Sequence, residues 1–443
     1  MNDLNQELWN KIRQQFDSDP YPNIPLEMSP KNDCQRLGLH SIEIAHYLRN
    51  RSVISPKNKL ILDAGCGAGY DSLSLAVANP GAKIIGIDLS QESVEIAQKR
   101  LNFHEFNNVE FHVLPIDEVA TLGYQFDYIN CDEVLYLFPN IANTLKLFKS
   151  VLKPDGIIRA NLHSMINRFN VFRAQEVFSM MGLMDENPEE FEISTVQETM
   201  KALKDNVNLK FLAWGADYEG AQSKQRILMN YLFQGDKGYK INDLFAALEA
   251  SELSFIKMTN WREWDLLNLF KEPDNLPAFL GMALPDITIQ EELQLFELLQ
   301  PKHRLLDFLC GYPGLNQDLI AVNEWNDQDW LTTIIHLHPQ ARFDENLKFN
   351  LENCIGRGIT FQKFKQLPLN QEFVTIESTM ALCLWPLFDQ PFTMNELVAY
   401  WQQRRPINGL TNETISTAEV FNLLKTLLTI LEEFDCVMLE QSV

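Results

Sequence analysis

The sequence predicts an α/β fold, in which a largely parallel sheet carries helices on both faces, followed by a mainly helical C-terminal region. Three observations indicate this. An apolar strand at 60–64 leads into a glycine-rich turn and a helix-forming segment, and a second apolar strand at 83–88 ends in an acid. Further strand-like runs follow at 108–113, 126–135 and 152–161. Strands that alternate with helix-forming stretches are typical of a parallel sheet with crossover helices.

The turn after the first strand contains three glycines, Gly65, Gly67 and Gly69. Glycine has no Cβ and tolerates a positive φ, so a ligand can lie directly against this backbone. A dinucleotide fingerprint would need a further glycine where Tyr70 stands, and counting from Gly67 puts the carboxylate of Asp71 where phosphate charge should lie. No Gly-Lys-Ser or Gly-Lys-Thr closes the turn as in a P-loop. The pattern therefore predicts a ligand with a nucleoside and no phosphate.

The second strand ends in Asp88, at close to the distance from Asp63 that puts a carboxylate on ribose hydroxyl groups. This strand, glycine turn, helix, strand and acid resemble motif I and its companion acid in class I S-adenosylmethionine-dependent methyltransferases. The resemblance continues in register: 108–113 resembles the third strand, 126–135 the fourth, and 152–161 the Leu-Lys-Pro-Gly-Gly turn and fifth strand. It implies a seven-stranded mixed sheet with helices on both faces, and S-adenosylmethionine as the cofactor.

The resemblance also implies roles for individual residues, carried over by position. The backbone of the glycine turn would contact the methionine part of the cofactor, Asp63 would shape the turn, and Asp88 would hold the ribose. Where the family often has an aspartate on the adenine amino group, this chain has Pro115, with Asp117 two residues later. The implied cofactor-binding residues are Asp63, Gly65, Cys66, Gly67, Gly69, Asp88, Leu89, Ile116, Asp117 and Cys131.

Four side chains are candidates for contact with the methyl acceptor. Asp132 and Glu133 follow the fourth strand, and His163 lies just beyond the fifth. In several related bacterial methyltransferases a Tyr-Pro segment covers the cofactor, which makes Tyr21 a candidate by resemblance. Each could take or orient the proton of an amine acceptor, and an ordinary solvated polar side chain is the alternative. The Glu-His pair of many small-molecule methyltransferases and the Asn/Asp-Pro-Pro-Tyr/Phe signature of amino-methylating nucleic-acid enzymes are both missing.

Composition argues against several classes of partner. The chain has 443 residues, enough for two or three domains, and a net charge of -23, which repels phosphate backbones and anionic membranes. We find no run of about 18 apolar residues that would cross a membrane. Asp3 and Glu7 argue against a signal peptide, so we expect a cytoplasmic location. The seven cysteines contain no Cys-x-x-Cys pair, and His336 and His338 lack a third ligand nearby, so we expect reduced thiols and no metal.

The first segment, 1–57, is predicted to contain a helix and a proline-rich cap. The prolines in 17–25 cannot continue a helix, because each lacks an amide donor and pushes its predecessor toward extended geometry. We expect this loop either to cover the cofactor or to be a simple linker. The preceding helix must bury one face, because apolar residues recur every four positions: Leu4, Leu8, Ile12 and Phe16, joined by Trp9.

The methyltransferase domain is expected to span 58–265, because a helix at 239–249 and a strand at 253–258 would complete its fold. Between the fifth strand and that helix lies an insert at about 165–238, which is rich in helix formers. Loops longer than about 15 residues in compact domains are usually functional. We interpret the insert as a helical lid over the acceptor site, and a packing extension is the alternative.

The rest of the chain reads as mainly helical, with one domain at 266–370 and a winged-helix-like unit at 371–443. In the latter, helices capped near Thr393 and Thr417 precede a strand at 436–439. This order loosely resembles bacterial protein-lysine methyltransferases, in which a catalytic domain precedes a regulatory domain and a winged-helix-like tail. The long C-terminal half favours a large or protein substrate. A C-terminal half that forms a homodimer would give the same sequence pattern, so a homodimer is the alternative.

The sequence therefore predicts a methyltransferase that transfers a methyl group by direct in-line displacement to a protein side chain or a small molecule. Orientation of the acceptor can supply about 7 to 11 kcal/mol of the barrier, and no covalent intermediate is required. A non-catalytic module that binds the cofactor for regulation is the alternative, but nothing in the motifs is broken enough to prefer it. A nucleic-acid acceptor is disfavoured by the charge and by the missing signature.

Overall fold

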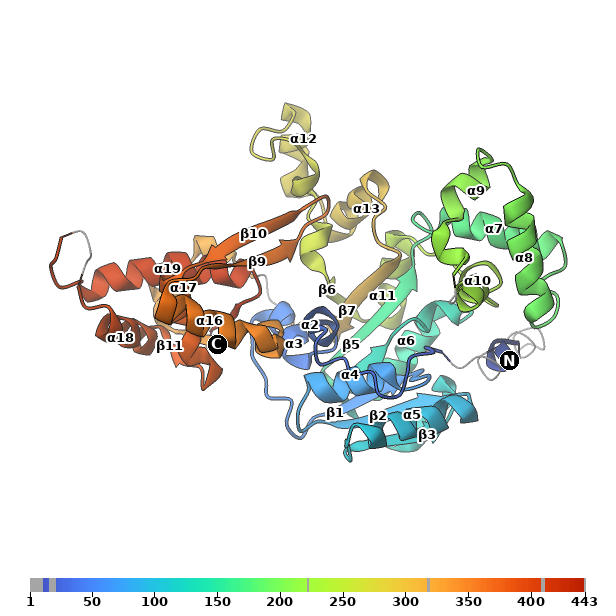
Figure 1. Cartoon of the computed structure of the whole chain (residues 1–443), viewed down its shortest axis with the longest axis horizontal. Coiled ribbons are helices and arrows are strands. Elements are labelled where there is room, and N and C mark those ends of the chain that lie inside the picture. Colours follow the sequence, from blue (N-terminus) through green and yellow to red (C-terminus); the bar gives the residue numbers. More distant parts are fainter. Residues whose placement is uncertain (1–10, 16–20, 221–222, 317–318, 408–410, 442–443) are drawn as a thin grey trace.

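A central sheet, a helical insert and a C-terminal unit make up the molecule (Figure 1). Ile12 is buried and lies in a helical stretch. Among the described residues, no helix combines the length and apolar character that crossing a membrane requires. The computed structural model describes residues 11–15, 21–220, 223–316, 319–407 and 411–441, and Leu4, Leu8, Trp9 and Phe16 of the predicted N-terminal helix lie outside them.

The central sheet is mixed. Strands β1 to β5 pair in parallel, whereas β7 is antiparallel to both of its neighbours. The parallel strands are apolar along most of their length, as strands covered on both faces must be. In spatial order the strands are β3 (Val109–Val113), β2 (Lys83–Asp88), β1 (Leu60–Ala64), β4 (Phe126–Cys131), β5 (Leu152–His163), β7 (Leu305–Gly311) and β6 (Ser254–Met258).

Helices cover both faces of the sheet and bury two separate cores against it. On one face, the helices contribute residues such as Ile42, Leu73 and Leu101 to the smaller core. On the other, Phe148 and Phe296 belong to the larger core, which runs on to the strands. The first face carries α3 (Ile42–Asn50), α4 (Tyr70–Ala78) and α5 (Gln91–Phe103), and the second carries α6 (Ile141–Ser150), α11 (Ile241–Ser251) and α13 (Ile289–Leu299).

The sheet extends beyond the boundary that the sequence predicts near 265. β7, at 305–311, pairs with β5 on one side and β6 on the other, so the expected end of the domain is wrong. The sequence predicts a mainly helical domain at 266–370 for this segment. A short apolar run buried on both faces has no alternation, and periodicity alone cannot separate it from a buried helix. The partner strand β5 also lies far away in the sequence.

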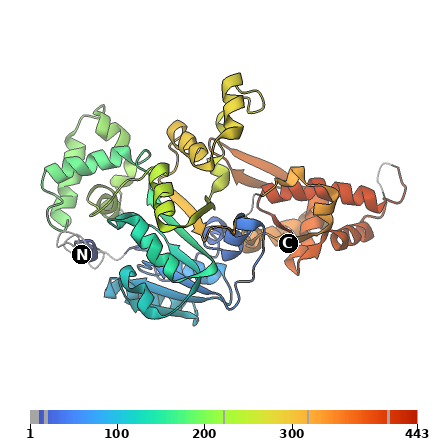
Figure 2. The same ribbon diagram turned by 180° about the vertical axis from the view of Figure 1, so that it is seen from behind.

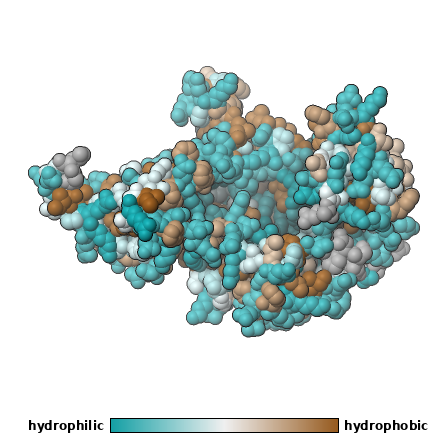
Figure 3. Space-filling model, viewed as in Figure 1, coloured by the Kyte–Doolittle hydropathy of each residue, from teal (hydrophilic) through white to brown (hydrophobic). Residues whose placement is uncertain are grey.

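The insert leaves the sheet after β5 and returns at Tyr239, which bridges to Ser164. Its helices pack around a core of their own, with Phe178 and Tyr231 fully buried. Figure 2 shows this helical body beside the sheet, away from the C-terminal unit. The hydropathy view in Figure 3 shows hydrophobic side chains among the hydrophilic ones on this part of the surface. The insert contains α7 (Phe169–Met180), α8 (Glu190–Ala202), α9 (Asn208–Ala213) and α10 (Ser223–Tyr231).

The C-terminal unit is largely helical and has one hydrophobic core, which runs from Val322 to Leu439. The predicted boundary at 370 is wrong, because it falls in the turn between the paired strands β9 and β10 and divides this core. A helix, a strand, two helices and a strand follow in winged-helix-like order, and the upstream strand β8 completes their sheet. The strands are β8 (Thr333–Leu337), β9 (Phe361–Gln366), β10 (Gln371–Ile376), β11 (Phe392–Thr393) and β12 (Val437–Gln441). The helices include α15 (Pro339–Phe343), α16 (Glu345–Arg357), α17 (Ser378–Leu384), α18 (Met394–Arg404) and α19 (Thr417–Glu433).

Candidate active site

The glycines of the turn between β1 and α4 allow other parts of the protein to pack closely against its backbone. Gly65 has a φ of 84°, and a Cβ there would lie 2.6 Å from the Val134 side chain. At Gly67, with a φ of 47°, a Cβ would overlap the main-chain oxygen of Tyr21. That oxygen accepts the N–H of Ala68 at 2.9 Å, so the segment that contains Tyr21 lies against the turn. Glycine is required here by both conformation and space.

Asp88 stands at the carboxyl end of β2, beside this turn. Its carboxylate accepts the N–H of Gly67 at 2.9 Å through one oxygen and the N–H of Ser90 at 2.9 Å through the other. The side chain is therefore held in one orientation at the edge of the sheet. Ligands in open α/β sheets bind at this edge, outside the carboxyl ends of the strands.

A cavity of about 500 Å³ lies along this edge. A volume of this size suits a cofactor together with part of an acceptor, because small-molecule sites generally measure about 300 to 1,000 Å³. Ten of the predicted site residues line it: Tyr21, Gly65, Cys66, Gly67, Asp88, Leu89, Ile116, Asp117, Asp132 and Glu133. Other lining residues include Arg36, Asp71, Val134, Tyr136 and Met229, the last of which comes from α10 of the insert.

Asp63 lies beneath the glycine turn and is almost fully buried. It accepts hydrogen bonds from Ser72 at 2.5 Å and from Asn130 at 2.9 Å. Burial, with the nearby charge of Asp71, raises the pKa of Asp63 to about 6. Asp63 is not among the residues that line the cavity, so the geometry gives it a supporting place under the turn.

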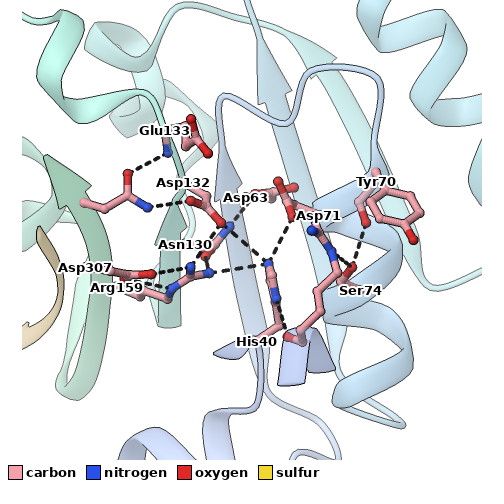
Figure 4. Close-up of polar contacts among 12 residues, drawn as sticks. His40, Asp63, Tyr70, Asp71, Ser74, Asn130, Asp132, Glu133, Arg159 and Asp307 are labelled. Atoms are coloured by element: carbon pink, nitrogen blue, oxygen red, sulfur yellow. Dashed lines mark hydrogen bonds and ion pairs between the residues drawn. The ribbon is translucent and has the colours of Figure 1, made fainter. Parts of the chain in front are cut away.

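Asp132 and Asp71, which both line the cavity, belong to a network of charged side chains (Figure 4). Arg159 lies 3.1 Å from Asp132 and binds Asp307 with two hydrogen bonds, at 2.7 and 3.1 Å. Asp71 pairs with Arg36 and lies 3.1 Å from Nε2 of His40. Burial raises the pKa of Asp132. Burial acts the same way on Asp71, but the hydrogen bond from His40 and the charge of Arg36 outweigh it and lower its pKa.

His40, Asp71 and Asp132 place three potential ligand atoms within 4.8 Å of one another, which is a spacing that a metal ion could use. Two guanidinium groups already stand beside these carboxylates, at Arg36 and Arg159. A divalent cation would be repelled by both, and the ion pairs account for the cluster without it.

Glu133 is held away from this network by Arg304. The two form a two-pronged pair at 2.5 and 2.9 Å, and the Glu133 N–H donates to Asn161 at 2.8 Å. Burial would raise the pKa of Glu133, but Arg304 outweighs it and lowers the pKa. Glu133 also has a left-handed φ of 55°, which is uncommon for a residue with a Cβ. Tyr21 stays a neutral phenol, because the charge of Glu133 and burial both raise its pKa.

His163 is buried behind the cavity wall, stacked on Tyr136 with the ring centroids 3.8 Å apart. Its Nδ1 lies 2.6 Å from Asp236, and its Nε2 lies 3.1 Å from Arg304. Because a guanidinium can only donate, Nε2 accepts and Nδ1 carries the proton. Burial lowers the pKa of His163, although Asp236 acts in the opposite direction.

A neutral, buried His163 predicts a pH dependence of stability. Below the ordinary histidine pKa of about 6.5 this histidine binds more protons in the unfolded chain than in the folded chain, so the free energy of unfolding falls as pH falls. One such proton is worth up to about 1.4 kcal/mol per pH unit. We expect His163→Gln to make this loss shallower by up to that amount, measured by urea unfolding between about pH 5 and pH 6.5. Equal slopes in the two proteins would contradict the neutral assignment.

Four predicted site residues do not line the cavity. Asp63 and His163 lie behind its wall, Cys131 is fully buried, and Gly69 is the N-cap residue of α4. Cys131 and His163 therefore do not reach the cavity in which a methyl group would be transferred, contrary to the roles predicted for them. The sequence predictions missed Arg36, Arg304 and Met229. None of these belongs to a motif, and each reaches the site from a distant segment. Asp71, which the predictions also missed, could have been found because it follows the glycine turn directly.

The parallel strands, the glycine turn, the acid at the end of β2 and the open cavity beside them define a class I S-adenosylmethionine-dependent methyltransferase domain. Comparison with known proteins gives the same answer. Residues 55–242 match the family model described as methyltransferase domain. The matched range contains β1 to β5 and the insert, so this part of the chain is similar to methyltransferase domains.

Individual relatives extend the comparison. The chain is 26% identical over 283 residues to an uncharacterized protein of Synechococcus sp.. The aligned region covers 63% of this chain and 64% of that protein. The chain is 38% identical over 104 residues to the ubiquinone biosynthesis O-methyltransferase of Bordetella bronchiseptica, covering 23% of this chain and 42% of that one. The chain thus spans less than two thirds of the length of either relative.

A solved structure resembles almost the whole chain. It is that of PKMT2 from Rickettsia typhi in complex with AdoHcy, with a TM-score of 0.59 and 17% identity, covering 96% of this chain and 78% of that one. At this identity the likeness concerns the fold. The likeness in fold includes the C-terminal half. From the sequence alone, the domain order of this half resembles that of bacterial protein-lysine methyltransferases only loosely.

Proposed function

We propose that this protein transfers the methyl group of S-adenosylmethionine to an amine nitrogen on a protein side chain. The observation that carries the proposal is the charge of the cavity wall. Asp71, Asp132 and Glu133 gather beside the neutral phenol of Tyr21, and Asp88 and Asp117 add two more carboxylates to the lining. Arg13 and Arg36 also line the cavity, but the five carboxylates outnumber them, so a singly charged cationic acceptor fits this wall better than an anionic one.

The carboxylates also answer a requirement of the reaction. The cofactor is a sulfonium cation, and an amine arrives as an ammonium, so the two would repel each other at contact distance. Fixed negative charges around both reduce this repulsion and do not have to reorganise during transfer. The ammonium must also lose a proton before its nitrogen can attack the methyl carbon.

Asp132 is the best base for this proton among the carboxylates of the wall. Burial raises its pKa, whereas Arg304 lowers that of Glu133, and a stronger base takes a proton more readily. Tyr21, with a raised pKa, would donate or accept a hydrogen bond to orient the nitrogen. A bound S-adenosylmethionine would supply the methyl group, and the nitrogen that has lost its proton to Asp132 would displace the sulfur, which would leave S-adenosylhomocysteine.

A protein acceptor is favoured over a small metabolite by the surface of the insert. Met180, Phe191 and Phe211 are large apolar side chains that are 84%, 70% and 74% exposed. Exposed apolar groups on a body that also contributes Met229 to the cavity suit contact with another protein. The insert would then act as a docking element beside the acceptor site, in line with the lid interpretation.

The proposal predicts that Asp132→Asn lowers kcat by about 10²- to 10⁴-fold, the usual contribution of a general base, while the Kd for S-adenosylhomocysteine changes little. The measurement is transfer of labelled methyl groups from S-adenosylmethionine to proteins of a cell lysate, followed by mass spectrometry of the modified peptides. Asp155→Asn, which changes an exposed acid at the start of β5, is the matched control. Label found on carboxylate esters, nucleic acid or small molecules would overturn the proposed acceptor.

A further inference from the structure

Helices α2 (Cys34–Leu39) and α3 lie between the sheet and the C-terminal unit (Figure 1). On the sheet side, Arg36 of α2 lines the cavity, pairs with Asp71 and donates from Nε to Ser74 at 2.9 Å. His40, which directly follows α2, donates from Nδ1 to the carbonyl oxygen of Arg36 at 2.8 Å. A displacement of α2 would therefore move part of the cavity wall.

On its other side, α2 is packed against α15 of the C-terminal unit. The approach is so close that a Cβ on Gly38 would overlap the side chain of Gln340. Next to this contact, Arg342 donates two hydrogen bonds to Glu43 of α3, at 2.9 and 3.4 Å. The Glu43 side chain is only 9% exposed, so loss of Arg342 would leave a buried carboxylate without this ion pair.

The same unit also holds the far end of α3. The Tyr47 hydroxyl donates to Glu432 at 3.1 Å and accepts the N–H of Leu439 at 3.1 Å. Arg51 lies 3.6 Å from Glu432 and donates to Tyr47 at 3.1 Å. Tyr47 and Arg51 are both buried. The pair of helices is thus fixed to the C-terminal unit along its whole length.

We infer that the C-terminal unit positions the cofactor cavity, and that Gln340 and Arg342 act on it through α2 and α3. The inference rests on the proposed function, because it takes the cavity that Arg36 and Asp71 line as the cofactor site. A helix as short as α2 has little stability of its own, so its place is set by what it packs against. Gln340 and Arg342 are positioning residues, because they reach the cavity only through other side chains.

The test is calorimetric titration of S-adenosylhomocysteine into the full chain and its variants, with Tm recorded for each. We expect Arg342→Gln to raise the Kd about five- to tenfold, at the lower end of the usual coupling between distant sites. Glu43→Gln should do the same, and the double variant should add little, because both remove one contact. Arg342→Lys should restore part of the affinity. A second variant, Gly38→Ala, inserts a methyl group between α2 and Gln340 and should weaken binding without removing any charge.

The control is Lys425→Gln, which removes an ion pair with Asp327 inside the C-terminal unit and should leave the Kd unchanged. If the wild-type protein binds S-adenosylhomocysteine and both Arg342→Gln and Gly38→Ala bind it equally tightly, the inference is wrong, whatever happens to Tm. If the wild-type protein does not bind, the proposed function fails instead.

Discussion

Asp88→Ala is expected to weaken the binding of S-adenosylhomocysteine by about 100-fold, because a ribose held by a carboxylate loses two charge-assisted hydrogen bonds of about 1.5 kcal/mol each. The loss should be larger than for any other single acid of the cavity. In the free protein Asp88 also accepts the N–H groups of Gly67 and Ser90, so part of the effect will come from a looser turn. Calorimetric titration measures the Kd directly.

Two further variants separate these contributions. Asp88→Asn keeps the size of the side chain and one acceptor oxygen, so it should bind better than Asp88→Ala and worse than the wild-type protein. Glu118→Ala removes an exposed acid from the segment after β3 and should leave the Kd unchanged. An Asp88→Ala protein that binds as tightly as the wild type, with the wild-type Tm, would remove Asp88 from the cofactor site.

Arg159→Met is expected to cause the largest loss of stability, about 3 to 5 kcal/mol in the free energy of unfolding. The Arg159 side chain is 3% exposed and pairs with both Asp132 and Asp307, so its removal leaves two buried carboxylates without their main counter-charge. The same change should also raise the pKa of Asp132. Urea unfolding of wild type and variant gives the difference.

Two further variants separate the buried pair from an ordinary ion pair. One breaks an ion pair on the surface, and the other removes both charges of the buried Arg159–Asp307 pair. Lys224→Met breaks a pair with Glu190 in which both side chains are more than half exposed, and should cost no more than about 1 kcal/mol. Adding Asp307→Leu to Arg159→Met removes one of the unpaired acids and should recover part of the loss. Equal effects for Lys224→Met and Arg159→Met would show that the buried network contributes little.

The cofactor half of the site was readable from the sequence because its residues follow local rules. A glycine turn after a strand and an acid at the end of the next strand meet at one edge of a parallel sheet, whatever the rest of the chain does. Gly65, Gly67 and Asp88 accordingly line the cavity together. Asp132 and Glu133 lie there for the same reason, since they follow the neighbouring strand β4.

The remaining charges of the site were hidden because long-range contacts place them. Arg36 lies in helix α2, which precedes the first strand in sequence, and Arg304 is the residue immediately before β7. Neither has a neighbour in sequence that marks it. The domain boundary failed for a related reason, because pairing with β5 rather than any local pattern decides that 305–311 is a strand.

The position of β7 also bears on how the protein is made. During synthesis the chain emerges from its N-terminus, and domains tend to fold as their residues appear. β5 ends at His163, but the strand that covers its edge lies at 305–311, so more than a hundred residues must follow before that edge is closed. Until then β5 presents unpaired backbone groups, which other strands can join. Contacts between such distant segments slow folding. A chain that ended at residue 265 would lack β7, so the edge of β5 would stay exposed and prone to aggregation.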